Sequence, residues 1–322
     1  MTKKSAIAIS VCAAVFVALL TVATFFDLEI SIAIGNADSV FGQFFDYLGE
    51  TPAWLGVPVG LLILYQALQK GHKFYKWLKP VLLVLTFVGF FFYSRYIVNR
   101  MFTDLKWKYL YITLFGLVFT FLAVIATNHV DKAIFEKLIV FALVLLIAIA
   151  VSQGIVELLK YVWSRQRFRN LQAGNVYEGT SAGFTPWYKP TLGKHDPDLF
   201  YPDALGGKSD SGAYKSFPSG HTAAAGASFA VVILPEIFEK LKKYGVWFYV
   251  IPGVYTAMVA VGRIVNRAHY LSDVLFGGTI SIICVFVAKF IILKLWNKYG
   301  EKVLNIHYGR EVAAEEKAEA TE

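Results

Sequence analysis

Long apolar runs dominate the chain, and short polar segments separate them. Eight of these runs have roughly 17–25 residues, the length that a helix needs to cross the hydrocarbon core of a bilayer. They lie at 6–26, 53–69, 80–98, 108–127, 136–159, 221–238, 246–264 and 272–295. A shorter segment, 36–50, has apolar residues at helical spacing and is expected to lie in the membrane interface. The pattern predicts an all-α fold, a polytopic membrane helix bundle of about eight spans.

The composition agrees with a membrane protein. Hydrophobic residues make up 57% of the 322 residues and charged residues only 17%, whereas about a quarter of the residues of a soluble domain are charged. The net charge of +8 indicates membrane topology and contact with anionic lipid, and we predict no nucleic-acid binding. Cys12 and Cys284 both fall inside apolar runs, so they define no disulfide framework.

The loop charges predict an orientation. If eight helices alternate in direction, four lysine-rich segments fall on one side: the N-terminus, the second loop, the loop before 246 and the tail 296–322. The positive-inside rule makes this side cytoplasmic, with both termini. The long polar loop 160–217 then lies outside the cytoplasm. One segment, 99–108, opposes this assignment because it carries Arg100, Lys106 and Lys108.

Three polar clusters stand at the ends of the later runs. The first, "KYVWSRQRFRN", opens the loop 160–217. Its Lys160 and Arg167 are seven positions apart, two helical turns, so both side chains could face the same way at the end of the fifth span. Cations that snorkel at a membrane edge are the alternative interpretation.

The second cluster, Pro-Ser-Gly-His at 218–221, comes directly before an apolar run. Gly220 lets a ligand approach the backbone closely, Ser219 adds a hydroxyl group, and His221 falls in the first turn of the sixth span. Free N–H groups at a helix start also attract anions. The alternative is a helix cap with an incidental histidine at the interface.

The third cluster, "GRIVNRAHYLSD", joins the seventh and eighth spans. His269 and Asp273 are four positions apart, so the carboxylate can lie one turn from the imidazole on the same face. Such a carboxylate fixes the tautomer of the ring and raises its basicity. Arg263 adds a cation, and a polar turn at the membrane edge is the alternative interpretation.

All three clusters fall on the outer side of an eight-helix arrangement. Fixed cations, a Gly-Ser turn and two histidines at one depth describe an anion pocket with an acid–base pair. In order and spacing, these motifs resemble those of the type 2 phosphatidic acid phosphatase (PAP2) superfamily, which includes vanadium haloperoxidases, over about 136–295. Two positions depart from the family pattern: Phe168 stands where a Pro usually follows the first Arg, and Gly262 where a Ser usually precedes the Arg of the third motif.

The resemblance implies a PAP2/haloperoxidase-like core. It divides the chain into N-terminal membrane helices at 1–135, a catalytic helix bundle at 136–295 and a cytoplasmic tail at 296–322. It implies that His269 attacks phosphorus to form a phosphohistidine, that Asp273 orients His269, and that His221 protonates the leaving oxygen and then activates water. The phosphate-binding residues that it implies are Lys160, Arg167, Ser219, Gly220 and Arg263.

No metal and no other cofactor are expected. Two histidines and an aspartate could indicate a zinc site, but three converging cations would repel Zn²⁺. The resemblance implies a membrane phosphatase acting on a lipid phosphate or diphosphate, of the undecaprenyl diphosphate, phosphatidic acid, phosphatidylglycerol phosphate or lipid A phosphate class. A phosphotransferase between membrane lipids and a vanadate-dependent haloperoxidase are the alternatives. The expected partners are this phospholipid or polyprenyl phosphate and the bilayer, and the oligomeric state is not predicted.

Overall fold

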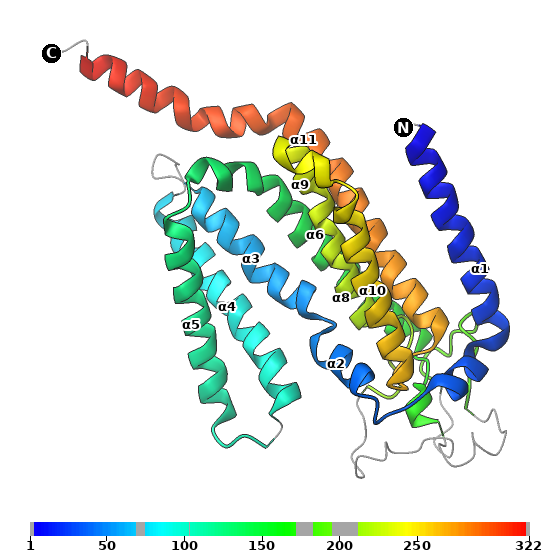
Figure 1. Ribbon diagram of the computed structural model, residues 1–322. Helices are drawn as coiled ribbons and strands as arrows, with labels where there is room; N and C mark the ends of the chain where they lie inside the picture. Colours follow the sequence, from blue (N-terminus) through cyan, green and yellow to red (C-terminus); the bar gives the residue numbers. More distant parts are fainter. Residues whose placement is uncertain (1–2, 69–74, 103, 172–182, 195–211, 320–322) are drawn as a thin grey trace. The chain divides into compact units, whose positions relative to one another are not determined.

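The computed structural model describes residues 3–68, 75–102, 104–171, 183–194 and 212–319. Within these ranges all regular secondary structure is helical (Figure 1). The longer helices are α1 (Lys3–Ile34), α2 (Val40–Leu48), α3 (Thr51–Ala67), α4 (Tyr75–Met101), α5 (Lys108–Asn128), α6 (Lys132–Trp163), α10 (Trp247–Val265) and α11 (Leu271–Glu319). The shorter ones are η1 (Phe168–Asn170), α8 (Gly220–Gly226), η3 (Ala227–Ile233), α9 (Leu234–Ile237) and η4 (Glu239–Tyr244).

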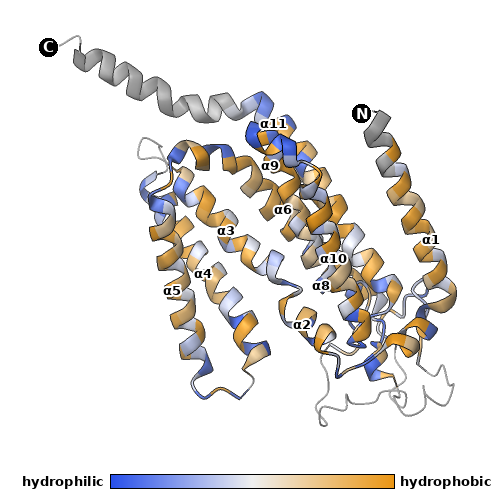
Figure 2. Cartoon of the chain, in the orientation of Figure 1, coloured by the Kyte–Doolittle hydropathy of each residue, from blue (hydrophilic) through white to orange (hydrophobic). Residues whose placement is uncertain are grey.

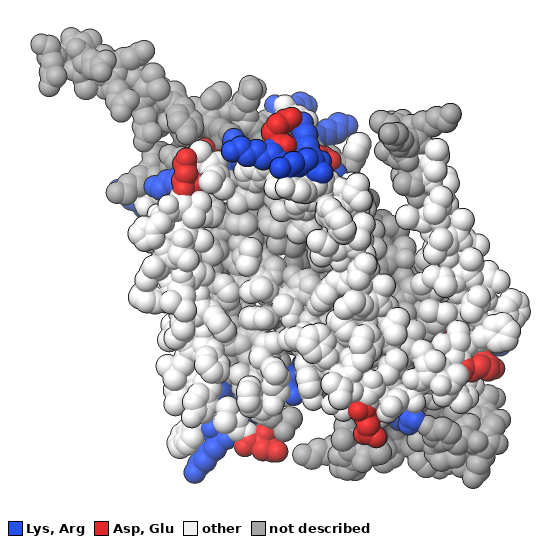
Figure 3. Space-filling model, in the orientation of Figure 1, with Lys and Arg blue, Asp and Glu red and all other residues white. Residues whose placement is uncertain are grey.

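The predicted number of spans, about eight, is confirmed, whereas the second candidate span, Val40–Ala67, begins earlier than predicted and includes most of segment 36–50, which the sequence assigns to the interface. Among the described residues, 8 helical segments are long and apolar enough to cross a membrane. Apolar residues run along these helices in Figure 2, and the face drawn in Figure 3 carries few charged side chains along their length. The protein is therefore an integral, multi-pass membrane protein with an all-α fold. Parts of the predicted outer loop, 172–182 and 195–211, lie outside the described residues.

The chain forms two compact units. The first consists of Met1–Glu50, Ala150–Ser228 and Val250–Ile282, and the second of Thr51–Ile149, Phe229–Tyr249 and Ile283–Glu322. The three polar clusters fall within the first unit. The division predicted from the sequence, with a boundary at 135, groups Met1–Glu50 with the N-terminal helices instead, and that division stays a prediction.

Two breaks in the helices of the first unit place polar side chains inside it. In α1, Phe26 has non-helical dihedral angles (φ −129°, ψ 18°), and the kink precedes Asp27, which is only 3% exposed. At the end of α6, Ser164 has a positive φ of 46°, a conformation that ends a helix. Arg167 therefore lies beyond the end of α6. The prediction that Lys160 and Arg167 face the same way on one helix, two turns apart, is wrong. The left-handed residue turns the chain before Arg167 is reached.

Phe168 is a core residue of the first unit. It is 6% exposed and packs in one cluster with Leu28, Leu171 and Tyr270. Its ring lies edge-on to that of Tyr270, with the centroids 6.2 Å apart. The turn that begins η1 is closed by backbone hydrogen bonds from Asn170 and Leu171 to the carbonyl of Arg167. Packing and these bonds thus fix the turn where the motif usually has a proline.

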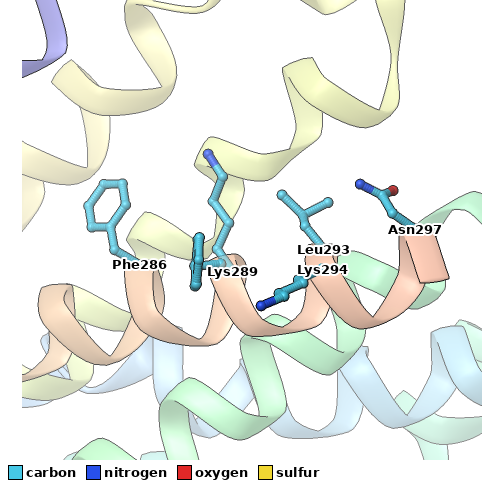
Figure 4. A pocket seen from close by; sticks show the side chains of 6 residues that line it. Phe286, Lys289, Leu293, Lys294 and Asn297 are labelled. Atoms are coloured by element: carbon cyan, nitrogen blue, oxygen red, sulfur yellow. The ribbon is translucent and has the colours of Figure 1, made fainter. Parts of the chain in front are cut away.

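The second unit has close contacts between its helices and a shallow groove. A Cβ added to Gly89 of α4 would meet Pro58 of α3 at 2.9 Å, so the glycine lets these two helices touch. The groove, of about 480 Å³, runs along α11 (Figure 4). It is lined by Phe286, Lys289, Phe290, Leu293, Lys294 and Asn297. None of these residues belongs to the three polar clusters, so the groove is separate from the candidate chemistry.

Candidate active site

The second polar cluster forms the start of α8. Ser219 is the residue that caps this helix, and its hydroxyl oxygen accepts a hydrogen bond from the N–H of Thr222 at 3.4 Å. The backbone N–H of Ser219 donates to the carbonyl of Asp273 at 2.9 Å. This bond fixes the second cluster against the third. His221 follows in the first turn of α8 and is 6% exposed.

Lys160 joins the first cluster to the second. It lies in the last turn of α6, with its side chain 12% exposed. A Cβ added to Gly220 would meet the Lys160 Nζ at 2.9 Å, so the ammonium group rests against bare backbone. Any side chain at 220 would push the cation away. The glycine therefore lets the Lys160 side chain approach the backbone, and the close approach of a ligand at this glycine stays a prediction.

Two carboxylates from the N-terminal part of the chain contact the same cluster. Asp46 of α2 pairs with the Nη1 of Arg263, and its Oδ1 is 3.5 Å from the Nε2 of His221. Glu50, two residues after α2, places its Oε1 3.0 Å from the Nδ1 of His221. Sequence reasoning missed both residues. The available signal was their spacing of four in an apolar, helical segment, which sets both carboxylates on one face.

His269 is buried and has a defined tautomer. Its side chain is 1% exposed, and its Nδ1 is 2.7 Å from the carbonyl oxygen of Ser216. A carbonyl only accepts hydrogen bonds, so Nδ1 carries the proton and Nε2 keeps its lone pair. Burial lowers the pKa of His269 well below its usual value, and the positive charges of Arg167 and Arg263 lower it further, against the opposing effect of Asp273. The ring is therefore neutral at neutral pH, the state in which it can act as a nucleophile.

Asp273 lies next to His269 but is held by other groups. Its Oδ2 is 3.6 Å from the Nδ1 of His269, beyond a normal hydrogen bond. The same oxygen accepts hydrogen bonds from the Ser216 hydroxyl at 2.5 Å and from the Tyr270 N–H at 2.9 Å. Ser216 thus contacts both the carboxylate, through its hydroxyl, and the imidazole, through its carbonyl.

Arg165 is a buried cation that sequence reasoning missed. It is 1% exposed, and its guanidinium binds Asp27 at 2.9 Å, Asp273 at 2.7 Å and the Ser272 hydroxyl at 2.8 Å. Its Cζ stands 4.1 Å above the centroid of the Tyr270 ring. Burial raises the pKa of Tyr270, so its hydroxyl stays neutral. Arg165 thus links the kink of α1 to the start of α11, because it binds a carboxylate in each of them, and it holds the carboxylate of Asp273 in place.

Arg167 is held by the end of the long loop. Its backbone N–H donates to the carbonyl of Ala213 and its Nε to that of Gly212, both at 2.7 Å. Its positive charge is one of the causes that lower the pKa of His269. The structure thus joins all three clusters in the first unit. The predicted site residues Lys160, Arg167, Ser219, Gly220, His221, Arg263, His269 and Asp273 all belong to it.

The geometry favours anion chemistry over metal binding at this site. Asp46 and Glu50 face opposite nitrogens of His221, so their oxygens do not converge on one point as metal ligands do. The positive charges of Arg167 and Arg263 lower the pKa of His269, and the ammonium group of Lys160 lies against Gly220. Cations arranged around a neutral imidazole can bind a phosphate group and present it to a nucleophile.

Comparisons with known proteins point the same way. Residues 141–297 match the family model of the PAP2 superfamily. A stretch of 76 residues is 32% identical to phosphatidylglycerophosphatase B of Bacillus subtilis (strain 168). This alignment covers 23% of the present chain and 37% of the relative's length. No solved structure matches the chain.

Proposed function

Because residues 141–297 belong to the PAP2 superfamily, we propose that the protein is a membrane phosphatase that hydrolyses a lipid phosphate through a phosphohistidine. One observation carries the proposal: His269 is buried and its Nδ1 is bound to the carbonyl of Ser216, so its Nε2 keeps a lone pair, and the positive charges of Arg167 and Arg263 act on the ring. Phosphoryl transfer needs a positioned nucleophile and positive charge on the equatorial oxygens, and both are present here.

In the first step, the Nε2 of His269 attacks phosphorus. The bond from phosphorus to the lipid oxygen breaks, and its electron pair goes to that oxygen, which takes a proton from the Nε2 of His221. Lys160, Arg167 and Arg263 neutralise the phosphoryl oxygens, with hydrogen bonds from Ser219 and the Gly220 N–H. The carbonyl of Ser216 accepts the Nδ1–H of His269 and so stabilises the positive charge that develops on the ring.

In the second step, water replaces the imidazole on phosphorus. His221, now neutral, takes a proton from the water as the oxygen attacks, and the bond from phosphorus to the Nε2 of His269 breaks. Inorganic phosphate leaves, His269 returns to its neutral state and His221 is protonated again. The two histidines have separate duties because their surroundings differ: a carbonyl partner for His269 and two carboxylates for His221.

The membrane spans and the relative support our proposal for the substrate class. The name of the Bacillus subtilis protein is phosphatidylglycerophosphatase B, and the site lies at the ends of membrane-spanning helices. We therefore propose phosphatidylglycerol phosphate or another lipid phosphate as substrate. The test is a panel of monophosphate and diphosphate lipids with the purified protein, in which released phosphate is measured. Phosphate that appears on a second lipid instead of in solution would identify a phosphotransferase.

Vanadate should inhibit the enzyme competitively, and EDTA should leave its activity unchanged. Vanadate copies the trigonal-bipyramidal phosphorus of the transition state and binds where that state is stabilised. The fixed cations of the site supply the positive charge for which other phosphatases use a metal ion. Initial rates at several lipid concentrations, with and without each reagent, check both expectations. A chemical step that stops in EDTA and returns with Zn²⁺ or Mg²⁺ would contradict the mechanism.

We further propose that the site faces away from the cytoplasm. The support is the charge distribution, in which four lysine-rich segments share one side of an eight-helix arrangement. With an even number of spans, both termini return to the same side, and the three clusters fall on the other. A lipid phosphatase in this orientation acts on the outer leaflet.

A single cysteine at position 189 should react with a membrane-impermeant maleimide in intact cells. Lys189 is exposed and lies in the described part of the long loop, and the labelled protein is Lys189→Cys with Cys12→Ala and Cys284→Ala. The matched control is Lys243→Cys, exposed in η4, which should react only after lysis. The reverse pattern of labelling would place the active site in the cytoplasm.

A further inference from the structure

We propose that Glu50 is a positioning residue that holds His221 in its protonated form for transfer of a proton to the leaving oxygen. This inference rests on the proposed phosphatase function and extends it to α2 and the residues after it, outside the matched segment 141–297. The supporting contacts are those of the two ring nitrogens of His221.

Both nitrogens of His221 face oxygen atoms that accept hydrogen bonds. The Nε2 is 3.2 Å from the backbone carbonyl of Asp46, which can only accept. The Nδ1 is 3.0 Å from the Oε1 of Glu50. A neutral imidazole donates through one nitrogen, whereas an imidazolium donates through both. The geometry therefore suits the charged ring, which is the form that a general acid needs before the reaction.

The charged groups around His221 have opposite effects on the protonation of its ring. Glu50 and Asp46 favour the protonated ring, whereas Lys160, over the adjacent Gly220, and Arg263, beside Asp46, favour the neutral ring. Without a carboxylate beside the ring, the cations that bind phosphate would also favour loss of the proton from His221. Glu50 lets one pocket hold both a phosphate and an imidazolium.

Asp46 and Glu50 have different roles because they differ in the groups that they contact. Asp46 pairs with Arg263, a cation that the proposed mechanism assigns to phosphate, so its carboxylate competes with substrate for that cation. Glu50 contacts the Nδ1, the nitrogen away from the proton transfer. It stays in place while the Nε2 gives its proton to the leaving oxygen and later takes one from water. Glu50 thus acts through His221 and does not touch the reacting atoms.

The packing of α2 supports this arrangement. Phe45 is 3% exposed and packs with Ala225 and Val259. A Cβ added to Gly262 would meet the Cβ of Phe45 at 2.7 Å, so the side chain expected at 262 from the motif would push α2 outward. A Cβ added to Gly49 would meet Val259 at 3.0 Å. Glycine at 262 therefore lacks the hydroxyl of the usual serine but allows close packing of α2, the helix that carries Asp46 and leads to Glu50.

The test compares two substrates and three variants. Phosphatidylglycerol phosphate has an alkoxide leaving group that needs a proton, whereas p-nitrophenyl phosphate releases a phenolate that does not. Glu50→Gln removes the charge and keeps an oxygen that can accept from the Nδ1. Glu50→Asp keeps the charge on a shorter side chain. Asp38→Asn, which removes an exposed carboxylate before α2, is the matched control.

For Glu50→Gln we expect kcat on the lipid to fall roughly 10- to 100-fold, with KM changed by less than about 3-fold. The basic limb of its pH–rate profile should move to lower pH, because the ring loses its proton more readily. The rate of the first burst of p-nitrophenol should stay within about 3-fold of wild type. Glu50→Asp should recover part of the lipid activity, and Asp38→Asn should match wild type.

Equal losses on both substrates with an unmoved pH profile would mean a merely structural role and would overturn the proposal, as would wild-type lipid activity in Glu50→Gln. If Glu50→Gln does not fold, the same comparison is made with Glu50→Asp, for which a selective loss on the lipid is expected. A wild-type protein that releases phosphate from neither substrate and fails to bind vanadate would instead contradict the proposed function itself. The two failures are thus distinguishable.

Discussion

Replacing His269 with alanine should abolish phosphate release, with a loss of at least about 10³-fold in kcat, because the proposed covalent intermediate forms on its Nε2. The side chain is buried and its Nδ1 is bound to the carbonyl of Ser216, which leaves on Nε2 the lone pair that the proposed mechanism uses to attack phosphorus. Phosphate release from the lipid measures the loss. Phosphohistidine is labile in acid and stable in base, so the protein is denatured with alkaline detergent after brief incubation with substrate radiolabelled in its phosphate group. It should hold phosphate in wild type and none in His269→Ala.

Two further variants separate chemistry from folding. His269→Asn keeps a side chain that can donate to the carbonyl of Ser216, so it should be inactive yet unfold at close to the wild-type temperature. His129→Ala removes an exposed histidine at the end of α5 and should keep full activity. Residual activity above about one part in a hundred in both His269 variants would contradict the assignment of the nucleophile.

The spans were predictable because each one is a local property of the sequence. A run of apolar residues long enough to cross a bilayer favours helical structure wherever its neighbours lie, although the run 221–238 is divided into α8, η3 and α9. The run 272–295 illustrates the limit of this reasoning, since α11 continues from Leu271 to Glu319. Hydropathy marks the apolar part of this helix and does not show where the helix ends.

The motifs predicted residue types better than their contacts. Spacing placed Lys160 in the last turn of the fifth span, where it lies. The same argument failed for Arg167, because Ser164 adopts a left-handed conformation that periodicity does not reveal. Spacing also set Asp273 beside His269, but the contacts of Ser216 with both side chains depend on how the loop before α8 folds back.

Ion pairs between residues far apart in the sequence could not be predicted from the sequence. Arg165 and Asp27 are 138 positions apart, and Arg263 and Asp46 are 217 apart. Helical periodicity relates residues within a few turns, whereas these pairs depend on the packing of α1 and α2 in the first unit. A carboxylate in an apolar run, such as Asp27, was the one available sign, because such a group needs a partner.

Replacing Arg165 with methionine should lower the free energy of unfolding by about 3–5 kcal/mol, the usual effect of removing one partner of a buried ion pair. The guanidinium is 1% exposed and holds two buried carboxylates, Asp27 and Asp273. Without it, both carboxylates stay buried with no cation between them. Denaturant-induced unfolding in detergent micelles measures the loss, and Lys243→Met, an exposed site in η4, should change stability by less than about 0.5 kcal/mol.

Two more variants test whether charge or shape causes the loss. Arg165→Lys keeps the charge, but an ammonium group is a point donor and cannot span both carboxylates as the guanidinium does, so its stability should lie between wild type and Arg165→Met. Adding Asp27→Asn to Arg165→Met removes one of the two unpaired charges and should recover part of the lost stability. A double variant no more stable than Arg165→Met would show that the loss comes from packing on the Tyr270 ring and not from the buried carboxylates.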